Sequence, residues 1–187
     1  MKMKYATDDL RHEHEVILVL LEALEGASEK MDKGEDVPHA DLEQMVQAIR
    51  TFADSCHHGK EEDLLFPALH QAGMPTDAGP IAVMLSDHEM GRAFVRGMAN
   101  ALVDMKTTQT GDAAFVENAF GYIQLLRSHI HKENNILFVM AEQMLPEAQQ
   151  KQLLEEFAAM EKVRIGDGVH EQIHQQVHDW HKKYAEV

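Results

Sequence analysis

The stretch Cys56–Pro67, CHHGKEEDLLFP, places two adjacent histidines one helical turn before two adjacent glutamates. Residues four apart lie on the same face of an α-helix, so His57 shares a face with Glu61, and His58 with Glu62. Leucines and a phenylalanine follow directly, which places the polar residues at the edge of an apolar stripe. Such a group can be a solvated polar patch, an acid–base pair or half of a metal site. The rest of the chain must supply the partners that decide between these possibilities.

Length, charge and composition restrict the function classes. The chain has 187 residues and a formal net charge of −15, which suits a single domain over residues 1–187 that phosphate backbones and anionic lipids would repel. We therefore expect no nucleic-acid partner and no membrane partner, and no apolar run is long enough to span a bilayer. The single cysteine, Cys56, and an N-terminus without a signal-peptide pattern favour a cytoplasmic location. Thirteen histidines are the unusual feature that needs an explanation.

Helical periodicity dominates the chain, and strand-like alternation is absent. Four long helices are predicted at about 7–31, 38–72, 80–106 and 112–145, and two shorter ones at about 147–163 and 169–185. A Thr7–Asp8 cap opens the first helix, and Pro146 stops the fourth. Short loops between long helices indicate antiparallel neighbours. The expected fold is all-α: an up-down-up-down four-helix bundle at about 8–145, with two additional C-terminal helices in an extension at about 146–187.

One histidine on each bundle helix shares the apolar stripe when side chains are projected at about 100° per residue. These four residues are His14, His57, His88 and His129, and Glu61 and Glu133 follow at i+4 on the second and fourth helices. By the same rule His12 and His131 face away, and His58 and Glu62 are rotated by roughly a quarter turn from the centre of the stripe. Because two of the four histidines lie early in their helices and two lie later, an antiparallel bundle brings all four into one half.

The joint pattern favours a metal site over ordinary packing. Taken singly, each of these histidines is more often a hydrogen-bonded packing residue than a ligand. Four imidazoles and two carboxylates in one apolar half-bundle would each carry a desolvation cost without partners. Imidazole plus carboxylate is the ligand set of iron, manganese or zinc. Six donors are too many for one tetrahedral zinc, but they suit two metals bridged by Glu61 and Glu133.

Four segments resemble the hemerythrin-like (HHE cation-binding) domains over about residues 8–145. They read RHEHEVILVLLEAL, CHHGKEEDLLFPAL, DHEMGRAF and HIHKENNILF, which carry a histidine, His-x-x-x-Glu, a histidine and His-x-x-x-Glu. The resemblance implies a four-helix bundle around two non-haem iron ions, for which zinc or manganese could substitute. It implies that the terminal ligands are His14, His57, His88 and His129. It also implies that Glu61 and Glu133 are the bridging carboxylates. His58 and Glu62 are then expected on the outer face or behind the ligands.

Arg92 is the main departure from oxygen-carrying hemerythrins, which have a fifth histidine four residues after the one that matches His88. The chain therefore resembles the four-His, two-Glu branch, associated with iron sensing, nitric oxide or peroxide chemistry, and iron–sulfur repair. We see no counterpart of the cysteine-bearing N-terminal extension of the repair proteins. Because a guanidinium cannot ligate iron, we expect Arg92 to pair with a carboxylate or reach water, leaving one iron with an open position. The expected partners are oxygen, peroxide or nitric oxide; protein partners and enzymatic activity stay open.

Other interpretations remain open. A ferritin-like di-iron oxidase needs Glu-x-x-His on two helices, and the sequence has one instance, Glu171 to His174. A structural zinc-binding helical module is the other alternative. The C-terminal histidines could bind a second metal or form a solvated flank: His170, His174, His178 and His181. The neighbouring apolar face is expected to dock on the bundle: Ile173, Val177, Trp180 and Tyr184. Tyr122 could hydrogen-bond near the metals or simply pack.

Overall fold

The computed structural model describes residues 4–108, 110–166 and 168–186. Helices and their connections account for these residues, which contain no strand, so the all-helical prediction is confirmed. In chain order the helical segments are α1 (Ala6–Asp32), α2 (His39–Ala48), η1 (Ile49–His58), η2 (Glu61–Leu65), α3 (Phe66–Gln71), α4 (Gly79–Thr108), α5 (Asp112–Lys132), η3 (Glu133–Leu137), α6 (Phe138–Met144), α7 (Glu147–Arg164) and α8 (Val169–Tyr184). Within the described ranges, no helix combines the length and apolarity that crossing a membrane requires.

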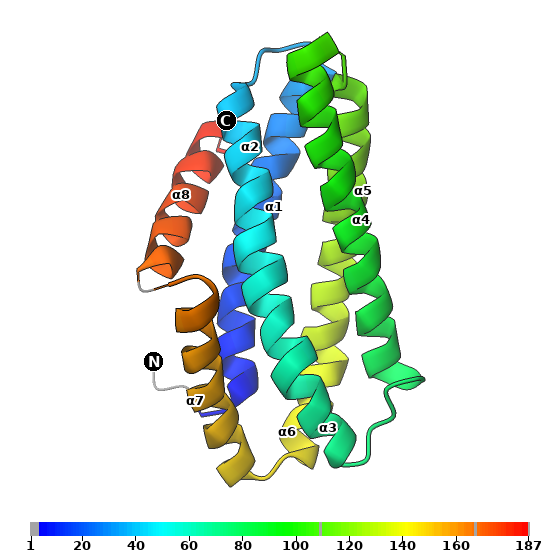
Figure 1. Cartoon of the computed structure of the whole chain (residues 1–187), viewed down its shortest axis with the longest axis vertical. Helices are drawn as coiled ribbons and strands as arrows, with labels where there is room; N and C mark the ends of the chain where they lie inside the picture. The colour runs from blue at the N-terminus through cyan, green and yellow to red at the C-terminus, as the bar shows by residue number, and fades with distance from the viewer. Residues whose placement is uncertain (1–3, 109, 167, 187) are drawn as a thin grey trace.

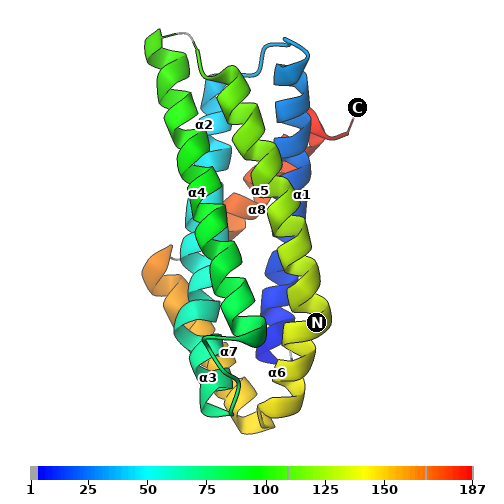
Figure 2. The same cartoon turned by 90° about the vertical axis from the view of Figure 1, so that its right-hand side faces the viewer.

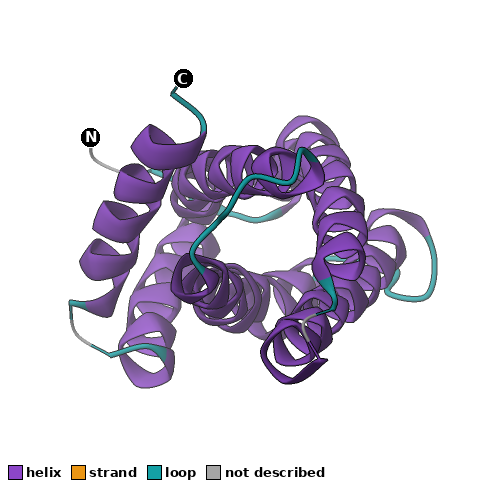
Figure 3. Cartoon of the chain, turned by 90° about the horizontal axis from the view of Figure 1, so that it is seen from above, coloured by secondary structure: helices purple, strands orange, loops and turns teal. Residues whose placement is uncertain are grey.

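Four long helical columns lie side by side, and consecutive columns run in opposite directions (Figures 1 and 2). The columns are α1, then α2 continued through η1 and η2 into α3, then α4, then α5 continued through η3 into α6. The view along the columns shows them arranged around a common axis (Figure 3). The α7 and α8 helices lie outside this group, with α8 packed along α1 and α7 against α1, η1 and η2. The extension therefore covers the side formed by the first two columns.

The predicted helix boundaries agree with the structure within two residues. The exception is the cap of α1. The helix begins at Ala6, and the backbone N–H of Tyr5 donates to the Asp8 carboxylate at 2.9 Å. The Thr7 hydroxyl instead donates to Glu142 at 2.8 Å, which ties the start of α1 to α6. Asp8 therefore caps the helix, whereas Thr7 makes a contact between columns.

Two separate apolar clusters fill the space between the columns. The larger one runs from Ile17 to the docked face of α8, and it includes Ile173, Val177, Trp180 and Tyr184, as expected from the sequence. Tyr122 packs within it at 1% exposure, and burial raises the pKa of its hydroxyl. The smaller cluster begins at Ala6 and includes Leu10, Leu69, Phe138 and Phe157. On every column the predicted site residues fall between the two clusters, so they form a polar layer across an apolar interior.

Three stretches of the second and fourth columns are π-helical. The η1 segment ends with His57 and His58, η2 begins at Glu61, and η3 begins at Glu133. Hydrogen bonds from i to i+5 give a π-helix more residues per turn than an α-helix, so successive side chains diverge by a smaller angle. Neighbouring residues can therefore face the same side. Such segments are frequent at functional sites, and here they coincide with the polar layer.

Candidate metal centre

Ligand atoms from all four columns converge in two groups. The first comprises His14, His57, Glu61 and Glu133, and the second comprises His58, Glu61, His88 and His129. Within each group, one ligand atom from every residue lies within 4.8 Å of the others. Glu61 belongs to both groups, and the six residues predicted from the sequence are each 1% exposed or less. The structure therefore brings all six predicted residues together, while their role as ligands stays a prediction.

The first group is held between α1 and η3. His14 Nε2 lies 2.9 Å from His57 Nε2 and 3.1 Å from a carboxylate oxygen of Glu133. His57 Nε2 lies 3.8 Å from the nearer oxygen of Glu61. Two imidazole nitrogens and two carboxylates thus face one small volume.

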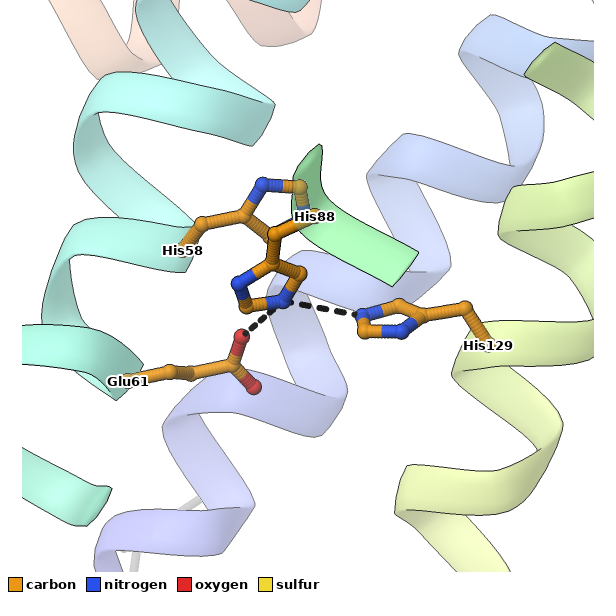
Figure 4. Close-up of side chains that lie close together, drawn as sticks. All are labelled: His58, Glu61, His88 and His129. Atoms are coloured by element: carbon orange, nitrogen blue, oxygen red, sulfur yellow. Dashed lines mark hydrogen bonds and ion pairs between the residues drawn. The ribbon is translucent and has the colours of Figure 1, made fainter. Parts of the chain in front are cut away.

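The second group lies beside the first and is drawn in Figure 4. His88 Nε2 lies 3.3 Å from His129 Nε2 and 3.4 Å from a Glu61 oxygen, the two contacts dashed in that figure. His129 Nε2 also lies 3.2 Å from the Glu133 oxygen that contacts the first group. Glu61 and Glu133 therefore lie between the two sets of imidazoles.

Each histidine of the centre uses its other ring nitrogen to bind a side-chain oxygen outside it. The Nδ1 contacts are His14 to Asn134 at 2.9 Å, His57 to Glu13 at 2.8 Å, His58 to Asp54 at 3.4 Å, His88 to Glu62 at 2.7 Å and His129 to Asp87 at 3.3 Å. Carboxylates only accept hydrogen bonds, so Nδ1 carries a hydrogen, and in a neutral ring Nε2 then keeps its lone pair. Metal-bound histidines are usually oriented in this way.

A basic side chain in turn holds each of these carboxylates. The pairs are Glu13 with Lys60 at 2.7 Å, Asp54 with Arg92 at 2.8 Å, Glu62 with Arg92 at 2.7 Å and Asp87 with Lys132 at 2.5 Å. Arg92 therefore pairs with carboxylates, which was one of its two expected arrangements. Glu62 lies behind His88, which is one of the two positions expected for it. Three basic side chains thus contact all four outer carboxylates, with Arg92 shared by Asp54 and Glu62, so these contacts offset part of the outer negative charge.

When its imidazoles are neutral, the interior of the centre lacks hydrogen-bond donors. All four carboxylate oxygens of Glu61 and Glu133 are buried without a hydrogen-bond partner, as is Nε2 of His58. A buried carboxylate is costly unless it is paired, and two imidazole lone pairs facing each other across 2.9 Å repel. Cations would bind both kinds of group. The imidazole and carboxylate set fits iron, manganese or zinc, so the residues present fit a metal centre.

Without a cation, protons must occupy the centre. Burial works to lower the pKa of His129, but the charge of Glu133 outweighs it and raises that pKa to about 10. Burial likewise disfavours the protonated forms of His57 and His88. Contacts with Glu61 favour these forms, and the pKa values of both histidines are raised. The metal-free centre is therefore held together by imidazolium–carboxylate pairs.

Of the two positions expected for His58, the outer face is wrong. The side chain is 3% exposed, and its ring stacks on His88 with centroids 3.9 Å apart and planes 17° apart (Figure 4). Burial and the charges of His88 and His129 lower its pKa well below the usual value, so the ring is neutral. The projection at about 100° per residue assumes an α-helix, whereas η1 is π-helical and turns His58 inward beside His57.

Lys60 supports the first group from behind, and the sequence analysis did not single it out. It is 1% exposed, and its ammonium lies 2.7 Å from Glu13, 2.9 Å from Asp9 and 3.2 Å from Glu161 of α7. Cys56 forms a third possible ligand group with Glu13 and Glu161, but the ammonium of Lys60 already supplies a positive charge there. Lys60 thus links the C-terminal extension to the carboxylate that orients a histidine of the centre.

The four C-terminal histidines do not gather around one point. His170 Nε2 lies 3.7 Å from Glu13, whereas His181 contacts Glu22 at 2.8 Å and His178 is exposed. Among the described residues of α8, no three potential ligands come within binding distance of one another. A second metal on this helix is therefore not supported, and one of its histidines instead adjoins the buried Lys60 network.

Replacing Lys60 with methionine should destabilise the metal-free protein by about 3–5 kcal/mol, because it leaves the buried Glu13 carboxylate without its cation. Denaturant unfolding followed by circular dichroism measures the loss. The matched control is Lys151→Met, which removes an exposed pair with Glu147 and should leave the free energy of unfolding nearly unchanged. Equal losses in the two variants would show that the Lys60 network contributes nothing special.

Stabilisation by a bound metal should increase with pH. The proton on His129, whose pKa is raised from 6.5 to about 10, stabilises the metal-free fold fully below 6.5, and this contribution is lost as pH rises toward 10. A metal must displace that proton, so its net benefit grows over the same window. Thermal unfolding with and without Mn²⁺, without oxygen, at about pH 6 and about pH 8.5 should show the larger rise in Tm at the higher pH. A larger rise at the lower pH would contradict the proton competition.

Comparisons with known proteins agree with this geometry. The Hemerythrin HHE cation binding domain family matches residues 5–141. A protein of Mycobacterium tuberculosis named as uncharacterized is 25% identical over 178 residues, which cover 95% of this chain and 69% of that protein. The iron-sulfur cluster repair protein YtfE of Pectobacterium atrosepticum is 31% identical over 134 residues, or 70% of this chain and 59% of that protein. No solved structure matches the chain. The chain belongs to the hemerythrin HHE cation-binding domain family.

Proposed function

We propose that this chain is a non-haem di-iron protein, built as a four-helix bundle, that reacts with or senses oxygen, peroxide or nitric oxide. One observation carries the proposal. The four carboxylate oxygens of Glu61 and Glu133 are buried at 0% exposure without a hydrogen-bond partner, and imidazole nitrogens that can hold either a proton or a metal surround them. This arrangement is stable only with positive charge at its centre.

The two groups of ligand atoms support a proposal for which residues would hold each metal. His14 and His57 would hold one iron, and His88 and His129 the other. Glu61, which belongs to both groups, would contact both metals, and so would Glu133, which reaches 3.1 Å from His14 and 3.2 Å from His129. Iron bound there would supply electrons to an oxidant, whereas the outer side-chain oxygens keep each imidazole in the orientation that binding requires.

The surroundings of the centre favour small reactants. Apolar clusters lie on both sides of the polar layer, and aromatic rings cover two of the histidines. Phe138 stacks on His14 with centroids 5.4 Å apart, and Phe66 on His88 with centroids 6.0 Å apart. A bulky organic substrate would have to displace this packing, whereas diatomic molecules and peroxide are small enough to enter through ordinary side-chain motion.

Two narrower roles have less support. The similarity to YtfE suggests a role in iron-sulfur cluster repair, but the one cysteine here, Cys56, is buried and its thiol pKa is raised to about 12. Repair chemistry that uses a thiol would need a thiol other than that of Cys56. The Glu-x-x-His pair of a ferritin-like oxidase, Glu171 and His174, lies on α8, away from the four columns' polar layer. Both roles therefore rank below reaction with, or sensing of, a small oxidant.

Metal analysis of protein made in iron-replete cells tests the proposal, with absorption spectra of the reduced form before and after oxygen or nitric oxide. We expect about two irons per chain, because two ligand groups are present, and a spectral change with either gas. Glu61→Ala should lose both irons, since Glu61 belongs to both groups. Glu117→Ala, which changes an exposed carboxylate of α5, is the control and should keep both.

Three results would contradict the proposal. One zinc per chain with no spectral response would favour a structural zinc module. A Glu61→Ala variant that keeps two irons would remove the shared carboxylate from the centre. Two irons that respond to neither gas would show a metal store rather than a reactive centre.

A further inference from the structure

We propose that His58 is an additional metal ligand of the second group, and that Arg92 is the positioning residue that holds His58 and His88 toward the metal. This inference rests on the proposed function, because it extends the ligand set of the same centre. It also assigns a role to the arginine at the position where oxygen-carrying hemerythrins have a fifth histidine.

The state of the His58 side chain is the first observation. It is 3% exposed, and its Nε2 is buried without a hydrogen-bond partner. Its Nδ1 lies 3.4 Å from Asp54, which leaves Nε2 as the nitrogen with a free lone pair. A ring nitrogen of His58 lies within 4.8 Å of ligand atoms of Glu61, His88 and His129. A buried nitrogen without a partner is costly, and a metal shared with these three residues would supply that partner.

Packing alone explains this residue less well. The ring stacks on His88 at 3.9 Å and also lies edge-on to His129, with centroids 5.6 Å apart. A phenylalanine could make both contacts without burying an unpaired nitrogen. The imidazole therefore adds a polar atom that packing does not need, at a place where three other ligand atoms converge.

Arg92 connects the outer carboxylates of the second group. Its Nε donates to Asp54 at 2.8 Å, and a terminal nitrogen donates to Glu62 at 2.7 Å. Asp54 contacts His58 and Glu62 contacts His88, so one guanidinium fixes the supports of two imidazoles. The rigid fork of an arginine can hold two carboxylates at once, which the single ammonium of a lysine does poorly.

The additional ligand makes the two metals unequal. The second group then contains three imidazoles, whereas the first contains two, His14 and His57. The sequence analysis predicts an open position on the iron beside Arg92. If His58 binds that metal, the metal held by His14 and His57 has the smaller number of protein ligands. A small oxidant would therefore bind at that metal, on the side supported by Lys60.

Proton NMR of the full chain loaded with Co²⁺ tests the ligand assignment. Paramagnetic Co²⁺ shifts the N–H proton of each bound imidazole far outside the normal range, and that signal disappears in D₂O. We expect two bound Co²⁺ per chain and five such exchangeable signals, one for each histidine in the two ligand groups. His58→Phe, which keeps a stacking ring, should give four signals and bind one of the two ions at least about ten-fold more weakly. His131→Phe changes an exposed histidine of α5 and should still give five.

Arg92→Gln tests the positioning role with the same spectra. The signals of His58 and His88 should both move, and one Co²⁺ should bind about 10–100-fold more weakly, the usual cost of losing support behind a ligand. The control is Arg127→Gln, which removes the pair with Glu25 on the surface and should leave all five signals in place. Loss of stability in Arg92→Gln without movement of these two signals would show a merely structural arginine and overturn the positioning role.

The outcomes separate this inference from the proposed function. Two Co²⁺ with four exchangeable signals in the unmodified protein would overturn the His58 ligand while leaving the two-metal centre intact. Fewer than two bound Co²⁺ would overturn both. Because the unmodified protein decides this point, the test does not depend on His58→Phe folding.

Discussion

The burial of two carboxylates, Glu61 and Glu133, among side chains that offer them no hydrogen bond is the constraint on which the rest of this structure depends. Both carboxylates lie in the polar layer between the two apolar clusters. Ionised groups in such a place require positive charge beside them. The converging imidazoles can provide it as protonated rings or can transfer the role to bound metal. Protons and metal ions therefore compete for the same nitrogen and oxygen atoms of the centre.

The outer layer shows how the chain prepares for the metal. Each imidazole is oriented by an oxygen behind it, and four of those five oxygens belong to carboxylates that contact a basic side chain, with Arg92 shared by two of them. These contacts offset part of the outer negative charge, whereas the inner carboxylates contact imidazoles. Metal binding then adds directly to the stability of the fold, since the ligands come from all four columns. The extension takes part through Glu161, which contacts Lys60 behind the first group.

Much of this could be predicted from the sequence, for identifiable reasons. Helical periodicity, together with Pro38, Pro146 and the glycine-rich turns, set helix boundaries that agree within two residues. Projection at about 100° per residue correctly turned His14, His88 and His129 inward, because α1, α4 and α5 are α-helical up to those residues. The apolar face of α8 was predicted to dock for the same reason.

The errors have equally clear causes. His58 lies in η1, where the π-helical spacing brings adjacent side chains onto one side. No residue type in CHHGKEED predicts the change from α-helix to π-helix. Lys60 could not be found from its own helix, since its partners Asp9, Glu13 and Glu161 come from α1 and α7. Local periodicity predicts which face is buried. It does not predict which buried charges will meet across columns.

X-ray absorption at the iron edge tests the central claim most directly, because it reports the neighbours of the metal itself. Iron-loaded protein should show a first shell of nitrogen and oxygen atoms only, with a second iron at about 3–4 Å, the spacing of a two-metal site that shares carboxylates. A sulfur shell would implicate Cys56, which lies outside both ligand groups of the polar layer. An isolated iron without a metal neighbour would contradict the claim that Glu61 and Glu133 are buried to hold two cations between them.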